Sequence, residues 1–407
     1  MKYEAVITGL GPVAPNGVGK EAFWEAIKSG KSGIRTIKKF SAEQFPCQIA
    51  GEVLPEWLEA YDSELPDWLP DSQACRFSLI GTMMALDDAG LSREEVGQSN
   101  SAIFMGVTTT DMEVILREYA TYLDTGMTRP DTLISSLPHI PAVIISHLFK
   151  SYDKVLTIST TCTSGINGII FGAESIARGE SDLVIAGGVD TPLTPQVLSS
   201  FCSAGMVPDA YNERPDEASR PFEENRKGGV LSEGAGIVII EEKKRAERRK
   251  ANIYALVSGG GLATAMSPGW MKKTMIKAMK GALESSSLKP KDIDLISACA
   301  PGDPIIDLAE TEAIKALFSD YAYNIPITSI KSMIGNPGAA AGPLQAIAAA
   351  LSIENKFIPP TINLLKPAKQ CDLDYVSNFG RIARVKKVMI NLRGFGGGFS
   401  SLILSQS

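Results

Sequence analysis

The chain has 407 residues, of which 44% are hydrophobic and 21% are charged, so it can bury a large core and form two domains or one duplicated domain. This composition excludes general disorder. The formal net charge is −6 and the isoelectric point is near 5.3. We therefore expect no nucleic-acid partner, because phosphate contacts need a surplus of Lys and Arg on one face.

The six cysteines are widely spaced and form no CxxC pair. This spacing suggests neither a zinc site nor a disulfide framework, so we expect free thiols in a reducing cytoplasm, with no metal and no cofactor. The N-terminus lacks the pattern of a signal peptide, and no apolar run approaches the roughly 18 residues of a membrane span. The sequence therefore predicts a soluble, untargeted protein with no membrane partner. The cysteines are Cys47, Cys75, Cys162, Cys202, Cys299 and Cys371.

The first part of the chain alternates strand and helix patterns. A β-rich apolar run, Glu4–Leu10, is expected to end in Gly9-Leu10-Gly11-Pro12 and to lead into an amphipathic helix over Lys20–Ser29. Lys31–Ser72 is predicted to form loops or a small excursion from the sheet, because Pro, aromatic and acidic residues are scattered through it. A helix from Phe77 to Gly90 and a strand at Ala102–Val107 follow.

A candidate nucleophile lies in Lys154–Asp190, where an apolar run ends at Thr160-Thr161-Cys162-Thr163-Ser164-Gly165 and a helical pattern begins. Cys162 is thus expected at a strand-to-helix corner. There, free backbone N–H groups and the positive end of the helix lower the pKa of a thiol and offer donors to an oxyanion. A free cysteine is more often a small core residue, but this position favours a nucleophile.

A histidine base for that cysteine is hard to find. The chain has only two histidines, His139 and His147, and both lie in Leu137–Lys150, an apolar helical pattern. Such histidines usually lie on a helix surface or pack against it, so we expect neither to act as a base.

Several segments recur in the second half of the chain. Ala85–Ser92 is echoed by Ala282–Lys289, and Glu4–Gly11 resembles Tyr254–Gly261. Strands that alternate with helices in two copies imply a duplicated α/β unit with sheets covered on both faces. The charge run Glu241–Ala251 is expected to be a solvated helix or loop between two halves, 1–250 and 251–407. Gly/Ala-rich helices are expected at Cys162–Arg178 and Gly335–Ile353.

Two strands, Val385–Asn391 and Ser400–Leu404, are predicted to close the chain as a hairpin. The turn between them, Arg393-Gly394-Phe395-Gly396-Gly397-Gly398, holds four glycines. Glycine permits positive φ and a close approach of the backbone to another group. A tight turn alone would need fewer glycines.

Five motifs spread along the whole chain support a family resemblance. They are Val6-Ile7-Thr8-Gly9-Leu10-Gly11, Thr161-Cys162-Thr163-Ser164-Gly165, Ser219-Arg220-Pro221-Phe222 with Glu233-Gly234-Ala235-Gly236, Lys331-Ser332-Met333-Ile334-Gly335, and Gly394-Phe395-Gly396-Gly397. In this order they resemble the β-ketoacyl-acyl carrier protein synthase family of the elongating, type II kind. The resemblance implies an α/β, thiolase-like αβαβα five-layer fold from two duplicated halves, in dimers that bind acyl chains on acyl carrier protein.

The same resemblance suggests roles for single residues. It places Cys162 at the acyl-accepting cysteine and Phe395 at the gating phenylalanine, whose backbone N–H joins that of Cys162 in the oxyanion hole. Lys331 matches the active-site lysine, and Glu310 matches an acidic residue downstream of the first catalytic histidine. The resemblance also implies that Thr108–Leu137 and Thr191–Ala218, where the family varies most, border the acyl tunnel or its entrance.

The chain departs from the family at the residues that perform condensation. Cys299, in Ser297-Ala298-Cys299-Ala300-Pro301, occupies the position of the first catalytic histidine, while Asp307 and Glu310 keep the surrounding frame. Asn336 occupies the position of the second. Gln345 replaces a usual glutamate, and Arg393 replaces the first phenylalanine of Phe-Gly-Phe-Gly-Gly. Cys299 is expected to fill the space of the histidine rather than act as a second thiol. Arg393 could hold a carboxylate or phosphate, or pair with an acidic neighbour across the dimer.

Two functions remain open at this point, besides that of an inert structural or regulatory homologue. The first is a non-condensing, chain-length-factor-like subunit that pairs with a histidine-intact ketosynthase in fatty acid or polyketide biosynthesis, although such subunits usually lack the cysteine too. The second is an acyltransferase, or an atypical condensing enzyme, that uses Cys162 as the thioester nucleophile without a histidine pair, as a homodimer. Loss of the histidines favours the first, and the retained cysteine corner favours the second.

Overall fold

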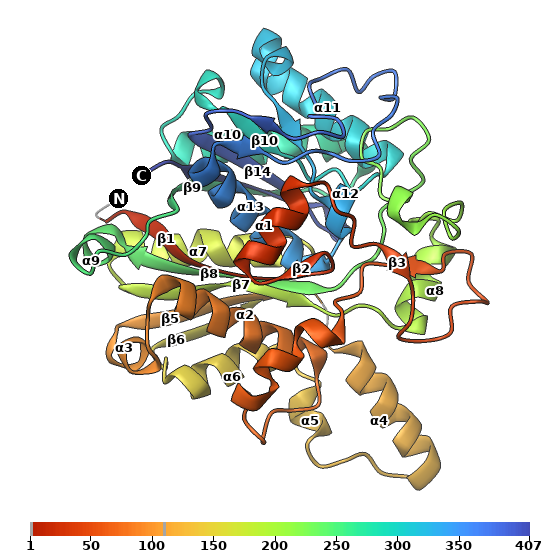
Figure 1. Ribbon diagram of the computed structural model, residues 1–407, viewed down its shortest axis with the longest axis vertical. Coiled ribbons are helices and arrows are strands. Elements are labelled where there is room, and N and C mark those ends of the chain that lie inside the picture. The colour runs from red at the N-terminus through yellow and green to blue at the C-terminus, as the bar shows by residue number, and fades with distance from the viewer. Residues whose placement is uncertain (1–2, 109–110) are drawn as a thin grey trace.

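The computed structural model describes residues 3–108 and 111–407, and Figure 1 shows how its helices and strands are layered. The main strands form one hydrogen-bonded series with two five-stranded halves. The N-terminal half consists of β1 (Ala5–Ala14), β5 (Ser101–Val107), β6 (Lys154–Ile158), β7 (Leu183–Asp190) and β8 (Gly234–Glu242). The C-terminal half consists of β9 (Ala255–Thr264), β10 (Leu295–Ser297), β11 (Ile327–Thr328), β14 (Lys387–Arg393) and β15 (Gly398–Ser405).

The two halves have one topology. The strand order is β1-β8-β7-β5-β6 in the first and β9-β15-β14-β10-β11 in the second, which is the same order when each half is numbered along the chain. The three strands farthest from the junction run parallel in both halves, and the other pairings are antiparallel. The halves meet where β1 pairs with β9 over only Val6↔Leu256 and Ile7↔Ala255. The predicted duplication is therefore confirmed. The exact division at residues 250 and 251 stays a prediction.

Helices separate and cover the two half-sheets, which gives the expected five layers (Figure 1). The outer layers are α2 (Gln73–Ala89) with α6 (Ile140–Phe149), and α10 (Met271–Ser285) with α11 (Pro304–Phe318). Between the half-sheets lie α7 (Ser164–Arg178) and α13 (Ala341–Asn355), with α1 (Lys20–Lys28) beside them. The recurring segments Ala85–Ser92 and Ala282–Lys289 lie at the ends of the equivalent helices α2 and α10, so the echo in sequence reflects equivalent places in the fold.

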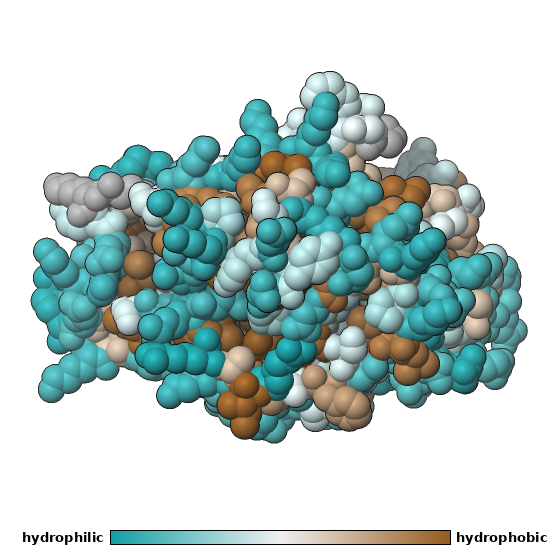
Figure 2. Space-filling view, turned by 90° about the horizontal axis from the view of Figure 1, so that it is seen from above, coloured by the Kyte–Doolittle hydropathy of each residue, from teal (hydrophilic) through white to brown (hydrophobic). Residues whose placement is uncertain are grey.

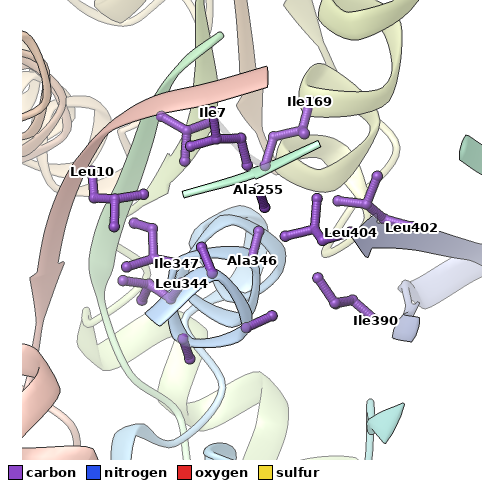
Figure 3. Packing of buried hydrophobic residues seen from close by; sticks show 14 of the residues in the cluster. Ile7, Leu10, Ile169, Ala255, Leu344, Ala346, Ile347, Ile390, Leu402 and Leu404 are labelled. Atoms are coloured by element: carbon purple, nitrogen blue, oxygen red, sulfur yellow. The ribbon is translucent and has the colours of Figure 1, made fainter. Parts of the chain in front are cut away.

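The central core surrounds α13, whose residues from Ala341 to Ile353 are all buried. Figure 3 shows Leu344 and Ile347 on the side of this helix near Leu10 of β1, and Ala346 on the side near Leu404 of β15. A Gly/Ala-rich helix suits this place, because small side chains let the two half-sheets approach it from opposite sides. The layer therefore joins the two halves through one hydrophobic cluster.

The first strand differs from its prediction. β1 does not end within Gly9-Leu10-Gly11-Pro12 but continues to Ala14. Gly9 and Gly11 make room for α2 rather than a turn, since a Cβ on either residue would lie within 2.0 Å of a backbone oxygen of that helix. The helix predicted from Phe77 begins at Gln73, where the Ser72 hydroxyl accepts the Cys75 N–H at 3.2 Å.

The charge run after β8 is less solvated than expected. It contains the short helix α9 (Lys243–Arg248), but Glu241 is fully buried. Its carboxylate accepts the Thr8 hydroxyl at 2.6 Å and pairs with Arg245 at 3.0 Å and with Arg249. The run therefore ties β8 to β1 at the boundary between the halves, because a buried carboxylate needs such partners.

The other predicted elements agree with the structure. Residues 31–72 hold only two short strands and two 3₁₀ turns, and β14 and β15 form the closing hairpin.

No described helix is long and apolar enough to cross a membrane, and no described cluster of His, Cys, Asp or Glu could hold a metal ion. The remaining helices are α3 (Arg93–Gln98), α4 (Met112–Thr125), α5 (Thr132–Ser135), α8 (Pro195–Ser203) and α12 (Lys331–Ile334). The remaining strands are β2 (Gly17–Val18), β3 (Arg35–Thr36), β4 (Ile49–Ala50), β12 (Phe357–Ile358) and β13 (Arg381–Ile382), and 3₁₀ turns lie at Pro55–Trp57, Glu59–Glu64, Pro215–Glu217, Pro268–Trp270, Pro290–Asp292, Ser319–Tyr323, Gly338–Ala340 and Phe395–Gly397.

Candidate active site

Cys162 lies at the predicted strand-to-helix corner, between the end of β6 and the start of α7. The residue before it, Thr161, has φ of 59°, a conformation that non-glycine residues rarely adopt. The Thr161 hydroxyl donates to the Phe395 carbonyl oxygen at 3.0 Å and so ties the corner to the closing hairpin. The Cys162 side chain is 5% exposed and faces a cavity.

The glycine turn holds the hairpin against this corner. A Cβ on Gly394 would lie 1.9 Å from the Thr161 hydroxyl, so only glycine fits there. This contact brings the Phe395 backbone N–H to the sulfur of Cys162. The close approach predicted for the turn is therefore confirmed, and its partner is the cysteine corner. An N–H in this place can donate to a thiolate or to an oxyanion formed beside it.

The pKa of the Cys162 thiol differs from the prediction. Burial raises it above the ordinary value, and the nearby Asp190 raises it further. The positive charge of Lys331 and the Phe395 N–H oppose this rise without cancelling it. The expectation of a lowered pKa was wrong, because it considered the helix terminus and not the desolvation of the sulfur.

Six of the predicted site residues line one cavity, although they come from distant parts of the chain. About 30 Å³ of this cavity is open to a water-sized molecule. A long acyl group therefore fits only if some of the lining side chains move. These six residues are Cys162, Cys299, Lys331, Asn336, Arg393 and Phe395.

The sulfur of Cys299 has two close partners in this cluster. The Lys331 ammonium lies 3.8 Å from the Cys299 sulfur, and the Arg393 backbone N–H donates to it at 3.2 Å. Burial nevertheless raises the pKa of the Cys299 thiol to about 11, with Lys331 opposing the rise. The thiol is therefore neutral near pH 7, and it is a weak hydrogen-bond donor.

Asn336 follows α12 and lies across the cavity. Its backbone N–H donates to the Val230 carbonyl at 2.8 Å, which fixes the residue beside the strand-like segment before β8. Its buried side-chain oxygen has no hydrogen-bond partner among the described residues. The amide is therefore free to bond to a molecule that enters the cavity.

Glu310 does not reach the cavity. Its carboxylate accepts the backbone N–H groups of Cys299 at 3.0 Å and Ala300 at 2.9 Å, and the Asn391 amide at 3.2 Å. Burial raises the pKa of Glu310, and these donors oppose the rise. The residue therefore supports the backbone that presents Cys299.

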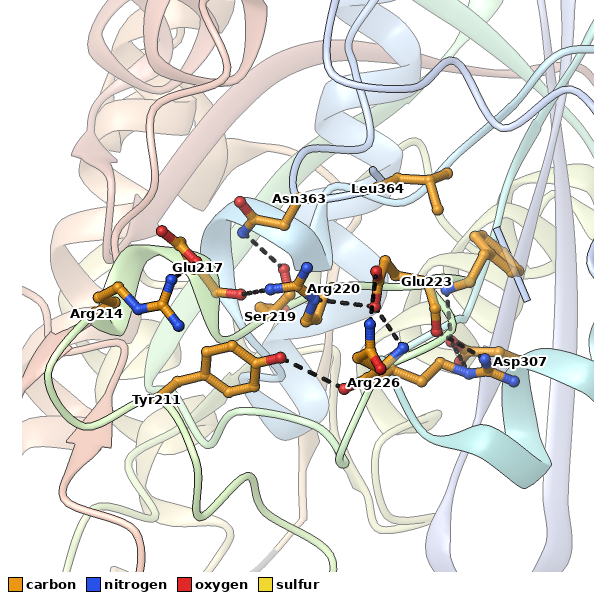
Figure 4. Close-up of polar contacts among 12 residues, drawn as sticks. Tyr211, Arg214, Glu217, Ser219, Arg220, Glu223, Arg226, Asp307, Asn363 and Leu364 are labelled. Carbon is orange, nitrogen blue, oxygen red and sulfur yellow. Dashed lines mark hydrogen bonds and ion pairs between the residues drawn. The ribbon is translucent and has the colours of Figure 1, made fainter. Parts of the chain in front are cut away.

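Asp307 belongs to a separate buried network, which Figure 4 shows together with Arg226. It accepts the Phe222 N–H at 2.9 Å and the Gly302 N–H at 3.2 Å, and Arg226 lies 3.4 Å away. Burial raises the pKa of Asp307 to about 7 despite these partners. Asp307 thus anchors the segment that holds the Ser219-Arg220-Pro221-Phe222 motif, whose Ser219 hydroxyl donates to the Lys331 carbonyl at 2.6 Å.

Gln345 also lies behind the site. The residue lies on α13, and its side-chain amide nitrogen donates to the Ser297 hydroxyl at 3.0 Å and the Ala298 carbonyl at 2.9 Å. It holds the end of β10, from which the chain runs to Cys299. Its place is therefore structural support and not contact with the cavity.

Both histidines lie away from this cavity. The side chains of His139 and His147 are exposed. His139 contacts the Thr157 hydroxyl at 2.8 Å, and His147 packs edge-on against Trp68. The surface interpretation is confirmed, and neither residue can serve Cys162 as a base in this conformation.

Several lining residues were not named from the sequence. Phe201 of α8 packs edge-on against Phe395, with ring centroids 5.4 Å apart, and Met206 lies beside it. Both fall within Thr191–Ala218, which was expected to border the entrance. No described residue of the other segment, 108–137, lines this cavity, and residues 109–110 lie outside the described ones. Asp303 could have been predicted from the sequence as the N-cap of the helix that begins at Pro304.

The duplicated five-layer fold and the cysteine corner together define a thiolase-like ketosynthase scaffold. The chain matches the family models of the β-ketoacyl synthase N-terminal domain over residues 3–246 and C-terminal domain over residues 253–365. It therefore belongs to the β-ketoacyl synthase family, as the motifs indicated.

Similar proteins come from fatty acid and polyketide synthesis. The chain is 33% identical to 3-oxoacyl-[acyl-carrier-protein] synthase 2 of Coxiella burnetii, over 100% of this chain and 99% of that protein. It is 34% identical to the tetracenomycin polyketide synthase ketoacyl synthase alpha subunit of Streptomyces glaucescens, over 98% of this chain and 96% of that protein. Among solved structures, the ishigamide ketosynthase/chain length factor covers 100% of both chains with a TM-score of 0.92 at 29% identity. A type II ketosynthase in complex with its acyl-carrier protein also covers 100% of both chains, with a TM-score of 0.92 at 28% identity.

Proposed function

We propose that this chain is a non-condensing, chain-length-factor-like subunit of a type II fatty acid or polyketide system. It pairs with a histidine-intact ketosynthase and works with acyl carrier protein. The observation that supports this proposal is the composition of one cavity. Cys299 and Asn336, the two positions at which the motif resemblance leads us to expect the histidines of the family, both line the space beside Cys162. Six free thiols favour the reducing cytoplasm as its place of action.

The chemistry of condensation explains why these two positions matter. Decarboxylation of a malonyl thioester develops negative charge on an enolate oxygen, which needs hydrogen-bond donors fixed in place. The neutral thiol of Cys299 is a poor donor, and Asn336 offers one amide. Loss of one preorganised donor typically lowers the rate by about 10²–10³. A cavity in which both histidines are replaced should therefore decarboxylate malonyl thioesters very slowly.

One end of the molecule offers a surface for a partner chain. β6 is the last strand of its half-sheet, and exposed apolar side chains lie on β6, on α4, α5 and α6, and on the loops between them. We call this surface the α4–α6 face. In contrast, Figure 2 shows that the opposite end is mostly hydrophilic, with small separate hydrophobic patches. An open strand edge beside a large apolar surface is a frequent site of protein association. The α4–α6 face consists of Tyr119, Tyr122, Leu123, Met127, Leu133, Ile134, Leu137, Val143, Tyr152 and Leu156.

The proposal is tested by purifying the chain alone and co-expressed with a histidine-intact type II ketosynthase from the same organism. We expect the pair to co-purify and to release CO₂ from malonyl-loaded carrier protein, and the chain alone to release almost none. Leu156→Glu should separate the pair, because it places a charge at the edge of β6. Leu262→Glu changes another exposed leucine, on β9, and should leave the pair intact. A homodimer that condenses by itself would overturn the proposal.

A second candidate function is acyl transfer to and from Cys162, which the complete cysteine corner and the Phe395 N–H favour. A thiolate that faces backbone N–H groups can attack a thioester without a histidine base. Intact-mass measurement after incubation with acyl-loaded carrier protein tests it. The mass gain should disappear in Cys162→Ala and persist in Cys299→Ala, which removes the other thiol of the same cavity. Equal mass gain in Cys162→Ala would contradict this function.

A further inference from the structure

Arg393 contributes a positive charge to the cavity of Cys162. It ends β14 and lines the cavity, and it is partly buried. Its charge acts on both cysteine sulfurs, at Cys162 and at Cys299. The buried Nε of its guanidinium has no hydrogen-bond partner among the described residues, and no described carboxylate lies within ion-pairing distance of the group. A buried guanidinium nitrogen in this state costs free energy, which an anionic ligand would offset.

The acidic groups near the cavity already have partners. Glu310 is bonded to two backbone N–H groups behind Cys299. Asp303 caps α11 by accepting the N–H groups of the first turn at 2.8 and 2.9 Å. Asp190 accepts the Ala339 N–H at 2.5 Å and the Thr108 N–H at 2.9 Å. Of the charged side chains that line the cavity, Lys331 and Arg393 are positive and Asp303 is negative, so positive charge is in excess.

We propose that this cavity binds the free carboxylate of a short dicarboxylic acyl thioester, of malonyl size, and that the Arg393 guanidinium is its partner. The inference rests on the second candidate function, in which Cys162 accepts acyl groups. Guanidinium and carboxylate match in shape and charge, and their hydrogen bonds are about twice as strong as neutral ones. The small open volume of the cavity favours a short acyl group over a long alkyl chain. A long alkyl chain would also bring no negative charge to pair with Arg393.

The acyl transfer needs no other reactant. The Cys162 thiolate attacks the thioester carbonyl, a new carbon–sulfur bond forms, and the bond to the carrier thiol breaks. The carrier thiolate leaves and takes up one proton, which balances the proton lost by Cys162. Arg393 holds the carboxylate in its charged form. Because decarboxylation would move that charge away from the guanidinium, Arg393 also stabilises the acyl group against loss of CO₂.

The test compares malonyl-, succinyl- and acetyl-pantetheine in two measurements. Intact mass follows acylation of the wild type, and calorimetry follows binding to Cys162→Ala, where no covalent step interferes. We expect malonyl-pantetheine to bind at least about tenfold more tightly than acetyl-pantetheine. Arg393→Met should remove this preference, and Arg393→Lys should keep part of it. Arg248→Met removes an exposed arginine on α9 and is the matched control, with the preference unchanged.

The outcomes separate this inference from the function on which it rests. Equal acylation by malonyl and acetyl groups, unaffected by Arg393→Met, would overturn the carboxylate site and leave acyl transfer standing. Absence of any acylation, together with tight malonyl binding that depends on Arg393, would overturn acyl transfer and leave the carboxylate site standing. Equal binding of all three compounds to Cys162→Ala would overturn the carboxylate site.

Discussion

The N-terminal half of the chain provides the nucleophile candidate of the cavity, and the C-terminal half provides most of the polar groups around it. The corner at Cys162 keeps the motif of the family and its contact with Phe395. Around it lie Cys299, Asn336 and Arg393, at which the sequence motifs indicate a departure from the family pattern. Because the two halves have the same strand order, they differ in the side chains that they bring to the cavity and not in the arrangement of their strands.

This comparison separates two chemical abilities that usually occur together in the family. Covalent capture of an acyl group needs a thiolate and backbone donors, which the corner provides. Decarboxylation needs side-chain donors fixed opposite the corner, and our proposal is that these are replaced. A duplicated scaffold can therefore lose the second ability and keep the first, since different elements hold the two sets of groups.

The largest effect is expected from breaking the contact between the halves. Gly394→Ala places a methyl group where the Thr161 hydroxyl lies, so the hairpin must move away from the cysteine corner. Because a displacement of about 1 Å in an active site can cost about 10²-fold in rate, acylation of Cys162 should fall by at least that factor. Intact-mass kinetics measure it.

The control for this change is Gly269→Ala, where an added methyl group meets open space. Thr161→Ala in the Gly394→Ala background should recover part of the rate, since it removes the nearest clashing atom. An unchanged acylation rate in Gly394→Ala would show that the hairpin does not position the corner.

Restoring both histidines should produce only a small gain in condensation. In Cys299→His with Asn336→His, we expect the rate of CO₂ release from malonyl-loaded carrier protein to rise by about 10² at most. This is roughly the rate effect of one preorganised hydrogen-bond donor. Arg393 remains in the cavity and still stabilises the carboxylate. Adding Arg393→Phe should raise the rate further. Efficient condensation by the double variant would mean that the two replaced histidines alone separate this chain from an active synthase.

Removal of the Lys331 charge should weaken the nucleophile. This charge opposes the raised pKa of Cys162, so Lys331→Met should raise that pKa further and leave less thiolate at pH 8. We expect alkylation of Cys162 by iodoacetamide to slow about tenfold, which corresponds to one pKa unit. The pH midpoint of the reaction should move upward. Lys277→Met, on the exposed face of α10, should change neither rate nor midpoint.

The smallest effect concerns stability, at Asp307. The pKa of this carboxyl is raised from 3.8 to about 7, so the folded state binds its proton more tightly than the unfolded chain. Its contribution to stability is therefore full below about pH 4 and is lost as the pH rises through 7. The slope from this group is at most about 1.4 kcal/mol per pH unit. Denaturant unfolding of Asp307→Asn between pH 5 and 8 should show a flatter dependence than the wild type, and parallel curves would contradict the raised pKa.

Local patterns in the sequence determined the elements that depend on neighbouring residues. The run before Thr160 and the helical pattern after Cys162 placed the corner correctly, and Gly90 marked the end of α2 with φ of 65°. The recurring segments predicted a duplication that the strand order confirms. These features follow from hydrophobic periods and from the conformations that glycine permits, which are properties of short stretches.

Only the tertiary structure decided how the site behaves chemically. The raised pKa of Cys162 comes from desolvation by surrounding elements, and no short stretch contains that information. Likewise, Phe201 meets Phe395, and the buried Nε of Arg393, a residue that lines the cavity, has no hydrogen-bond partner among the described residues. Sequence alone therefore determined the family, the frame and the identity of the groups, while burial and long-range contacts determined their charge and their partners.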